Sequence, residues 1–572
     1  MKQISTLLLV CLYSYTSIYS QTVNRNDVVI DELMADPTPQ AGLPNNEWIE
    51  LKNTTSFSIN LQGWRISDRS GQSGSMPNFV LQPDSFVIIC SASAAAAMSV
   101  FGTTISVTSF PSLDNAGDQL SLRNAQGKMI HAVNYTDKWY QNELKKEGGW
   151  TLEMIDTKNP CSGFSNWIAG NDSKGGTPGK KNSVDASNPD NIPPSLLRAY
   201  ATDSVSIILV FDEPLDSLKA VAVSNFIISD GIGTPKNVIA ITPVFDKLNL
   251  KLNMPLQNNK VYTVTASTLT DCSGNIIGSK NKVLVGISSN AGIFDVVINE
   301  ILFNSRAGAV DYVEIYNRSK KIIDLSNLSI ANRNTAGVVS NIKQLNPENY
   351  LFFPEAFMVI TSDFTIVKRD FITLNPDAFT ELTVMPAFND DKGNAIILNA
   401  QGMIIDELAY TEKWHFKLIE NPAGVALERI DYNAPTQQQD NWHSAATSVG
   451  YGTPTYKNSQ YRSDTDNKGT IRVSPEIISP DNDGMDDFAT VDYLFPSPGY
   501  VANITIFDAV GRPVRYLQQN ALCGIKGYYR WDGLGEKFQK LPSGIYIVFT
   551  EVFNLAGKKK QFKNTIVVAK RN

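Results

Sequence analysis

The fold of this chain is decided by a motif that occurs twice, first as Glu47-Trp-Ile-Glu50-Leu-Lys-Asn53 and again as Asp311-Tyr-Val-Glu314-Ile-Tyr-Asn317. In both stretches short apolar runs are interrupted by polar residues, a pattern that is typical of short β-strands. An earlier stretch repeats as well, because Val28-Val-Ile-Asp-Glu32 corresponds to Val296-Val-Ile-Asn-Glu300. The paired motifs indicate that two parts of the chain share one β-rich design.

The repeat continues beyond these motifs at a nearly constant separation. Asn124-Ala-Gln-Gly127 recurs unchanged as Asn399-Ala-Gln-Gly402, which is 402 − 127 = 275 residues later. The same separation carries Leu152-Glu153 onto Leu427-Glu428. A separation that persists over roughly 160 residues indicates a duplicated domain, because chance similarity does not keep its spacing.

Within each copy the sequence predicts short strands joined by tight turns. Phe79-Val-Leu-Gln-Pro-Asp-Ser-Phe-Val-Ile-Ile89 contains two apolar runs around a Pro-Asp turn. Leu120 to Val133 has the form of a hairpin with Asn and Gly in its turn. The best candidate for a helix is the short stretch 94–100. Several short strands at this spacing predict a β-sandwich.

The repeated motifs, together with Leu61-Gln-Gly-Trp64-Arg-Ile-Ser-Asp68 and a closing Asn-Trp and Gly-Thr-Pro block, resemble the lamin-tail domain. That family is an immunoglobulin-like module common in secreted bacterial proteins. The resemblance covers 27–184 and 295–460, and we place the two modules at 21–184 and 295–460. The second copy departs from the pattern at Leu328, where the first has Trp64, so its assignment there depends on the internal repeat.

Two further segments complete the chain. Residues 190–288 contain Val205-Ser-Ile-Ile-Leu-Val-Phe-Asp-Glu-Pro-Leu215 and Leu269-Thr-Asp-Cys-Ser-Gly-Asn275, which resemble the bacterial immunoglobulin-like spacer domain of surface-layer and cell-wall proteins. Residues 471–572 contain Pro542-Ser-Gly-Ile-Tyr-Ile-Val548 and resemble the C-terminal domains of type IX secretion cargo, including those associated with gliding motility, and the flagellar hook-cap module. We therefore expect an all-β fold of four Ig-like β-sandwich modules in a row after a signal peptide.

The first 20 residues predict that signal peptide. Lys2 supplies the positive end and Leu7-Leu-Leu-Val-Cys-Leu12 the apolar stretch, with cleavage expected after Ser20. No later segment has the ~20 apolar residues that a membrane-spanning helix needs. The net charge of the 572 residues is 50 − 57 = −7. A nucleic-acid binder held by a basic surface has the opposite sign, so no nucleic-acid partner is expected.

Four cysteines follow the expected cleavage site: Cys90, Cys161, Cys272 and Cys523. They are too few for a disulfide framework, and no C-x-x-C pair indicates zinc or redox chemistry. Cys90 and Cys161 fall in one repeat and are candidates to pair, although the sequence leaves the pairing of all four open.

An aspartate-rich stretch at 479–490 is the best candidate for an ion site. Aligning Gly484 with the turn glycine of a calcium loop gives three carboxylates and one carbonyl as candidate Ca²⁺ ligands: Asp481, Asp483, Met485 and Asp487. Ser479 and Thr490 occupy the two ends, where an EF-hand has acidic ligands. An Asx-rich turn that needs no ion is therefore the alternative.

Other polar residues give weaker predictions. Carboxylates recur in both copies and could bind a cation or transfer protons, but a structural role is favoured because any structural feature is duplicated too: Glu32, Glu47 and Glu50, matched by Glu300, Asp311 and Glu314. Glu47 and Trp48 point to opposite faces of a strand, so Glu47 is expected in solvent. The three histidines, His131, His415 and His443, have no metal-binding or catalytic spacing. No catalytic residue and no cofactor besides Ca²⁺ is predicted.

These observations predict a non-enzymatic protein, secreted or on the outer-membrane surface, whose modules adhere, scaffold or bind. Its expected partners are the type IX secretion machinery and an unidentified cell-surface or extracellular polymer. One alternative is an accessory extracellular hydrolase resembling a nuclease, since lamin-tail modules accompany such enzymes, although no segment is left for a separate catalytic domain. Another alternative is a component of the export or gliding machinery itself.

Overall fold

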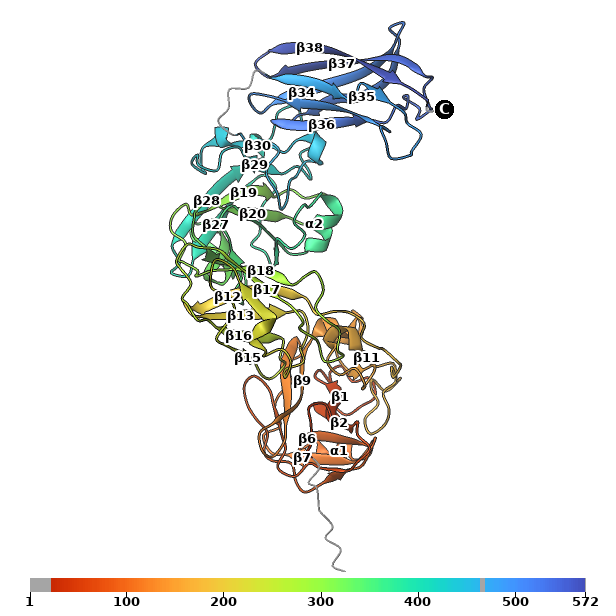
Figure 1. The fold of residues 1–572 in the computed structure, drawn as a ribbon, viewed down its shortest axis with the longest axis vertical. Coiled ribbons are helices and arrows are strands. Elements are labelled where there is room, and N and C mark those ends of the chain that lie inside the picture. The colour runs from red at the N-terminus through yellow and green to blue at the C-terminus, as the bar shows by residue number, and fades with distance from the viewer. Residues whose placement is uncertain (1–21, 463–468, 571–572) are drawn as a thin grey trace, which may run out of the picture. The chain divides into compact units, whose positions relative to one another are not determined.

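The computed structural model describes residues 22–462 and 469–570 (Figure 1). The predicted signal peptide, residues 1–20, lies outside the described residues. The chain divides into two compact units, of which the first runs to Arg198 and adds Val205–Met254 and Thr263–Val283, and the second contains the rest. Short strands dominate throughout, so the predicted all-β fold is confirmed. Within the described ranges, no helix combines the length and the apolar character that crossing a membrane requires.

The first module is a sandwich of two sheets. Its larger sheet has the order β11-β10-β1-β2-β6-β7 and its smaller sheet the order β4-β8-β9, while β3 pairs with β5. The strands are β1 Val28–Met34, β2 Trp48–Asn53, β3 Ile59–Asn60, β4 Arg65–Ser67, β5 Val80–Leu81, β6 Phe86–Ser91, β7 Thr104–Val107, β8 Gly117–Arg123, β9 Met129–Thr136, β10 Leu152–Met154 and β11 Trp167–Ala169.

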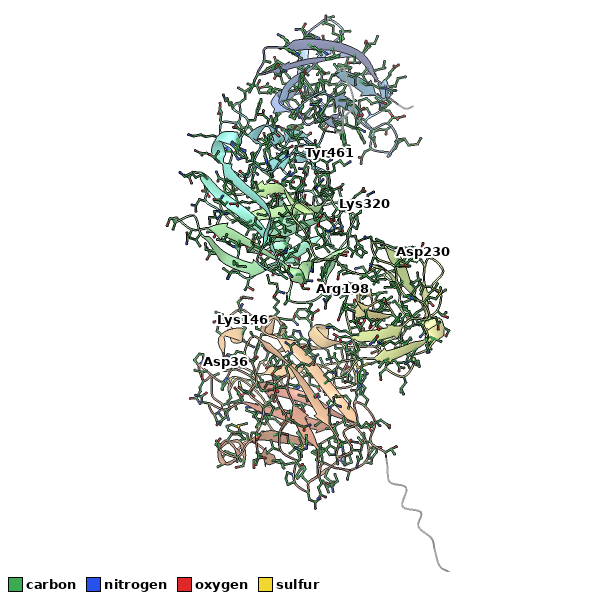
Figure 2. The ribbon with its side chains drawn as sticks, turned by 90° about the vertical axis from the view of Figure 1, so that its left-hand side faces the viewer. Asp36, Lys146, Arg198, Asp230, Lys320 and Tyr461 are labelled. Carbon is green, nitrogen blue, oxygen red and sulfur yellow. A yellow bond between two sulfur atoms is a disulfide. The ribbon has the colours of Figure 1, made fainter. Side chains whose placement is uncertain are left out.

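Both faces of the larger sheet are covered, which strand periodicity alone does not reveal. Ile49 and Leu51 of β2 pack into the main core between the sheets. Trp48 packs on the opposite face with Met34 and Cys90. Every residue of β2 is therefore buried, including Glu50. In Figure 2, Asp36 and Lys146 mark this module.

The central module has two smaller sheets, with the orders β12-β13-β16-β15 and β14-β17-β18. Pairing of β13 with β16 and of β15 with β16 is antiparallel. The strands are β12 Leu196–Asp203, β13 Ser206–Phe211, β14 Phe226–Ile228, β15 Asn237–Ala240, β16 Lys247–Lys251, β17 Tyr262–Ala266 and β18 Lys282–Val285.

The second repeat copy reproduces the first. Its large sheet has the order β26-β25-β20-β19-β29-β30, beside a sheet β23-β22-β27-β28 and a pair β21-β24. The strands are β19 Val296–Leu302, β20 Tyr312–Asn317, β21 Ile323–Asp324, β22 Leu328–Arg333, β23 Val339–Gln344, β24 Leu351–Phe352, β25 Phe357–Thr361, β26 Phe379–Glu381, β27 Lys392–Asn399, β28 Ile404–Thr411, β29 Leu427–Arg429 and β30 Trp442–Ser444.

The C-terminal module pairs a three-stranded sheet, β31-β33-β36, with a five-stranded sheet, β32-β38-β37-β34-β35. Aromatic and branched side chains, including Trp531 and Val548, fill the space between them. The strands are β31 Thr470–Ser474, β32 Ile477–Ile478, β33 Ala489–Leu494, β34 Tyr500–Asp508, β35 Pro513–Leu522, β36 Lys526–Trp531, β37 Gly544–Asn554 and β38 Lys559–Val568.

Two short α-helices interrupt the repeat copies. Helix α1, Ala95–Met98, lies within the predicted stretch 94–100. Helix α2, Phe364–Asp370, was not predicted. It begins at Asp363, whose carboxylate accepts hydrogen bonds from the amides of Thr365 and Ile366, as an N-cap residue does.

Candidate functional sites

Three carboxylates gather inside the first module on neighbouring strands. Glu32 of β1 is in register with Glu50 of β2 and with Glu153 of β10, and all three side chains are fully buried. Burial raises the pKa of the Glu32 carboxyl well above its ordinary value, and the charge of Glu153 raises it further. Such groups must keep protons or accept hydrogen bonds, because a buried unpaired charge is very unfavourable.

The donors come from the Gly-Thr-Pro segment that closes the module. The Thr177 amide donates to Glu32 at 2.7 Å, and the Thr177 hydroxyl donates to both Glu32 and Glu153 at 3.3 and 3.1 Å. The Gly179 amide donates to Glu50. The carboxylates therefore anchor the last loop of the module across the sheet.

The second copy repeats this arrangement with Glu300, Glu314 and Glu428. The Thr453 amide and hydroxyl donate to Glu300, and the hydroxyl also donates to Glu428 at 2.8 Å. The Tyr312 hydroxyl adds a bond of 2.5 Å to Glu300. Since protein donors take up the carboxylate oxygens of this second copy, its geometry favours the structural interpretation over a cation or catalytic site.

Sequence reasoning identified only part of this group. Glu47 lies apart from it, half-buried, and accepts a hydrogen bond of 3.0 Å from the Leu113 amide. The expectation that Glu47 lies free in solvent is therefore wrong, because the 113 loop covers it. Glu153 was missed as a member, although its recurrence as Glu428 in the second copy was a usable signal.

The aspartate-rich loop of the C-terminal module brings its carboxylates together. One oxygen each of Asp481, Asp483 and Asp487 lies within 4.8 Å of the others. The Asp487 carboxylate accepts from the Asn482 amide at 2.6 Å and the Gly484 amide at 2.8 Å. Asp481 and Asp483 are exposed, so these oxygens face water. The loop can thus form a turn by itself and also presents oxygens to a cation.

A disulfide joins the first module to the central module within the first compact unit. Cys161, between β10 and β11, is bonded to Cys272, between β17 and β18, across 111 residues of sequence. Cys90 and Cys523 are buried free thiols. The candidate pairing of Cys90 with Cys161 is therefore wrong, since Cys90 lies in the core behind β2 and Cys161 lies on a loop at the edge of the module.

Polar contacts surround this disulfide. The Arg25 guanidinium donates to the carbonyls of Leu215 at 3.2 Å and Val244 at 3.3 Å, and it lies 4.4 Å from the centre of the Phe245 ring. The Ser273 hydroxyl of the central module donates to Oδ1 of Asn159 in the first module at 3.3 Å. We call the contact between these two modules the joint. It is held by one covalent bond and by donors from both modules.

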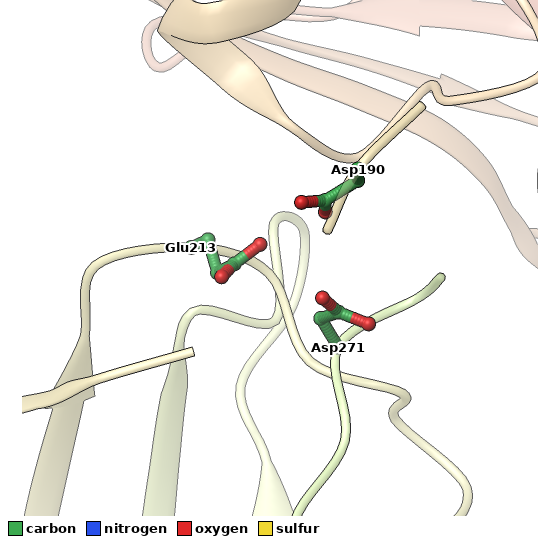
Figure 3. Close-up of side chains that lie close together, drawn as sticks. All are labelled: Asp190, Glu213 and Asp271. Carbon is green, nitrogen blue, oxygen red and sulfur yellow. The ribbon is translucent and has the colours of Figure 1, made fainter. Parts of the chain in front are cut away.

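Three more carboxylates converge at the joint (Figure 3). They come from the segment before β12, the end of β13 and the loop after β17, and their oxygens lie within 4.8 Å of one another: Asp190, Glu213 and Asp271. Burial, followed by the charges of Asp190 and Asp271, raises the pKa of the Glu213 carboxyl to about 8. Near neutral pH this group therefore retains a proton on Glu213, and a divalent cation would compete for the same oxygens.

A pocket of about 360 Å³ lies beside these carboxylates, lined by Arg25, Trp139, Phe164 and Glu213 among others. His131 also lines it, but its Nδ1 accepts a hydrogen bond of 3.1 Å from the Ile30 amide. Burial lowers the pKa of His131 to about 3, so the ring is neutral. Sequence reasoning missed this pocket because its residues come from two modules.

The other two histidines lie in the second copy. Nδ1 of His415 is 3.0 Å from the Ser444 hydroxyl, and Nδ1 of His443 is 3.0 Å from the Ser444 carbonyl. Burial lowers the pKa of His415 to about 4. In the ranges that the structure covers, none of the three histidines belongs to a group of metal-ligating side chains.

Comparison with known proteins supports the repeat. Residues 21–137 and 288–412 match the lamin tail domain family, so the resemblance is confirmed for both copies. No curated protein matches the chain. The N-terminal part of the bacterial S-layer protein SbsC is 20% identical over 29% of this chain, with a TM-score of 0.17, and the chain spans 44% of that structure.

Two other solved structures are similar over longer stretches. PorZ, a surface component of the type IX secretion system of Porphyromonas gingivalis, is 11% identical over 79% of this chain and 56% of its own, with a TM-score of 0.15. A Ca²⁺-stabilised adhesin of an Antarctic bacterium is 8% identical over 96% of this chain and 100% of its own, with a TM-score of 0.12. At such scores these likenesses carry no argument about function.

Proposed function

We propose that this chain is a non-enzymatic protein of the cell exterior that scaffolds or adheres through its β-sandwich modules. The observation that carries this proposal is the joint, where a disulfide and partly buried polar contacts hold two modules together. Disulfides persist in oxidising compartments outside the cytosol. A fixed joint suits a protein that holds binding surfaces at a set spacing.

Peptide mapping of protein recovered from the cell surface tests this function. Without reductant, the peptides that contain Cys161 and Cys272 are expected to travel as one species, and reduction should separate them. Recovery of the protein only from the cytosol, with both thiols free, would refute the proposal. Intact-mass measurement of the same sample locates the cleavage expected after Ser20.

The C-terminal module serves in this proposal as the export signal for type IX secretion. The support is the order of motifs in residues 471–572, which resembles the sorting domains of such cargo. Deleting these residues is expected to leave the protein in the periplasm. If the protein instead co-purifies with outer-membrane complexes in stoichiometric amount, it is a component of the export or gliding machinery.

Binding to an extracellular polymer is the activity that the proposal assigns to the modules. The purified mature chain is expected to bind cells or insoluble polysaccharide in a sedimentation assay. Absence of binding, together with turnover of a substrate, would favour an enzyme over a non-enzymatic binding protein.

An accessory hydrolase remains the second candidate because of the pocket beside Glu213. A carboxyl whose pKa is about 8 can donate a proton at neutral pH, as a general acid does. Zymography with nucleic acid and polysaccharide, using the wild type and Glu213→Gln, separates the candidates. A zone of clearing that the substitution abolishes would establish the enzyme.

Calcium binding by the 481–487 loop is the ion-dependent part of the proposal. Asp481, Asp483 and Asp487 supply carboxylates, and the Met485 carbonyl supplies a fourth oxygen. Isothermal calorimetry with Ca²⁺ is expected to show one weak site that Asp483→Asn removes. An absence of heat at millimolar Ca²⁺ would leave an ion-free Asx turn.

A further inference from the structure

The two lamin-tail copies differ at one buried position that lies at a bulge beside their carboxylates. The pairing of β1 with β2 shifts register between Ile30 and Glu32, and β19 with β20 shifts between Ile298 and Glu300. Such a bulge directs one residue out of the alternating pattern. That residue is Asp31 in the first copy and Asn299 in the second, and each is at most 1% exposed.

In the second copy the Asn299 amide bridges two acceptors. Its Nδ2 donates to Glu314 Oε1 at 2.8 Å and to Asn458 Oδ1 at 2.7 Å. Asn458 Nδ2 in turn donates to the carbonyls of Asn299 at 3.0 Å and Arg429 at 2.9 Å. Every one of these donors and acceptors is thereby satisfied.

The first copy keeps the same frame around a different side chain. Asn182 corresponds to Asn458, and its Nδ2 donates to the carbonyls of Asp31 at 3.0 Å and Met154 at 2.9 Å. Glu50, which corresponds to Glu314, is bonded by the closing segment in the same way. These matching contacts place the Asp31 carboxylate where the second copy has the Asn299 amide.

The substitution leaves three buried oxygens without a donor. Asp31 Oδ1, Glu50 Oε1 and Asn182 Oδ1 have no hydrogen-bond partner among the residues that the structure describes. The atoms that correspond to Glu50 Oε1 and Asn182 Oδ1 are the two that Asn299 bridges in the second copy. Buried acceptors without donors are strongly unfavourable, so something absent from the protein chain must supply a positive charge or a hydrogen.

We propose that the first lamin-tail module binds a proton at this position, shared between the carboxyl groups of Asp31 and Glu50. The proton converts one carboxyl into a hydroxyl donor and removes one of two buried negative charges. It thereby replaces one hydrogen bond of the Asn299 amide. A calcium ion fits the site less well, because it takes six to eight oxygen ligands and only three oxygens are left without donors here.

The charges around Asp31 support a bound proton. Four further carboxyl groups act on Asp31 or are affected by it: Glu32 on its own strand, Glu153 on β10, and Asp84 and Asp185 on the adjoining loops. Lys52 on β2 is the cation that faces Asp31, but its Nζ lies 3.4 Å from Asp84. Burial raises the pKa of Asp31 to about 7 against the lowering by Lys52, and burial also raises the pKa of Glu50 well above its ordinary value.

The direction of the pH dependence follows from these raised values. A carboxyl whose folded pKa lies above its unfolded pKa stabilises the fold fully at low pH, where both states are protonated. That contribution is lost as the pH rises from about 4 through about 7. The first module is therefore expected to lose this contribution of Asp31 between about pH 4 and about pH 7, and the second module, with Asn299, has no such contribution to lose.

Asp31→Asn tests the proposal because it installs the side chain of the second copy. Hydrogen exchange followed by mass spectrometry on the full-length protein reports β1 and β19 separately. The protection of β1 in the variant, divided by that in the wild type at the same pH, is expected to rise by up to about tenfold per pH unit between about pH 4 and about pH 7 and to level off above that range. Asn299→Asp is the matched variant, and β19 is expected to lose protection with the opposite trend.

Two results would overturn the proposal. If Asp31→Asn changes the protection of β1 by the same factor at every pH, no proton is bound at this position. If Na⁺ or Ca²⁺ restores the protection of wild-type β1 at pH 9 and has no effect on Asp31→Asn, the ligand is a metal ion. Infrared spectra supply a second readout should Asp31→Asn not fold, since Glu50→Gln must then remove a protonated-carboxyl band.

Discussion

The two lamin-tail copies satisfy the same buried amide with different chemistry. In the first copy the amide of Ile30 donates to Nδ1 of the neutral His131 at 3.1 Å. In the second copy the amide of Ile298 donates to the Asp406 carboxylate at 2.7 Å. His131 and Asp406 occupy equivalent positions in the repeat, so one copy places a neutral ring where the other places a charge.

The neighbours of this position change together with it. Arg429 lies 3.4 Å from Asp406 and donates to the Ile298 carbonyl at 2.7 Å, and Thr436 donates to Asp406 at 2.5 Å. The equivalents of Arg429 and Thr436 in the first copy are Met154 and Cys161. In the second copy the buried Asp406 carboxylate is accompanied by a cation, Arg429, and by the Thr436 hydroxyl. In the first copy the ring of His131 is neutral, so the position of Thr436 can hold Cys161, which forms the disulfide with Cys272.

Removing the cation from the second copy should give the largest effect. Arg429→Met installs the residue of the first copy and leaves Asp406 as a buried charge without its cation. Breaking a buried ion pair in this way costs about 3–5 kcal/mol. Hydrogen exchange of β28 and β29 in the full-length protein measures the loss, and β9 and β10 of the first copy serve as internal reference.

The double substitution Asp406→His with Arg429→Met checks that the loss of stability comes from the unpaired charge of Asp406. It rebuilds the neutral arrangement of the first copy and is expected to recover more than half of the lost free energy of unfolding. If the double variant is no more stable than Arg429→Met, packing around Arg429 explains the loss and the charge does not.

Acid should lower the stability of the first copy through the protonation of His131, which has no histidine equivalent in the second copy. Its pKa falls from 6.5 to about 3 on folding because burial disfavours the charged ring. A base whose folded pKa is lowered stabilises the fold above its unfolded pKa, and that contribution is lost as the pH falls from 6.5 toward 3. The loss is on the order of 4 kcal/mol at pH 3.

The measurement is urea unfolding of the first module at pH 7 and pH 3.5, followed by hydrogen exchange of β9. His131→Asn keeps an acceptor near Ile30 but cannot be protonated in this range. The difference between the variant and the wild type should therefore shift in favour of the variant at pH 3.5. An unchanged difference would mean that His131 is charged in the folded state or remains neutral in both.

Much of this fold could be predicted from the sequence, because strand period and turn residues act locally. The strand within Glu47–Asn53 and the hairpin around Asn124 follow from contacts between near neighbours. Helix α2 could not be predicted in this way, since seven residues give too little periodicity and its start depends on the Asp363 cap. Strand parity also failed for Glu47, because a loop covers the face expected in solvent.

The buried polar groups were harder to predict because their partners are remote in sequence. Glu32 and Glu50 were recognised as a repeated pair, but Thr177, which donates to Glu32, is 145 residues away from it, and Gly179, which donates to Glu50, is 129 residues away. Cys161 and Cys272 belong to different modules, and only the docking of those modules brings them together. The carboxylates at the joint, Asp190, Glu213 and Asp271, were missed because they are far apart in the sequence and only the fold brings them together.

Converting Cys161 to the residue of the second copy tests the joint. Cys161→Thr removes the disulfide, and a native disulfide typically contributes about 2–5 kcal/mol. We expect the central module to unfold at lower urea concentration and the segment 183–194 to become sensitive to protease. Reductant should produce the same change in the wild type and none in the variant, and a variant that responds to reductant would contradict the disulfide assignment.

Arg25 should give the smallest effect, and it decides whether the joint has strength beyond its disulfide. Its equivalent in the second copy is Ile293, which is 72% exposed. Arg25→Ile removes two hydrogen bonds to the central module and the contact with Phe245, a loss of about 1–2 kcal/mol. Ile293→Arg is the matched surface change, expected within about 0.5 kcal/mol of the wild type. Hydrogen exchange of the amides around Val244 measures the difference between the two variants. Equal exchange in both would mean that the Cys161–Cys272 disulfide alone attaches the central module. Faster exchange in Arg25→Ile alone would mean that the polar contacts are a second, independent attachment.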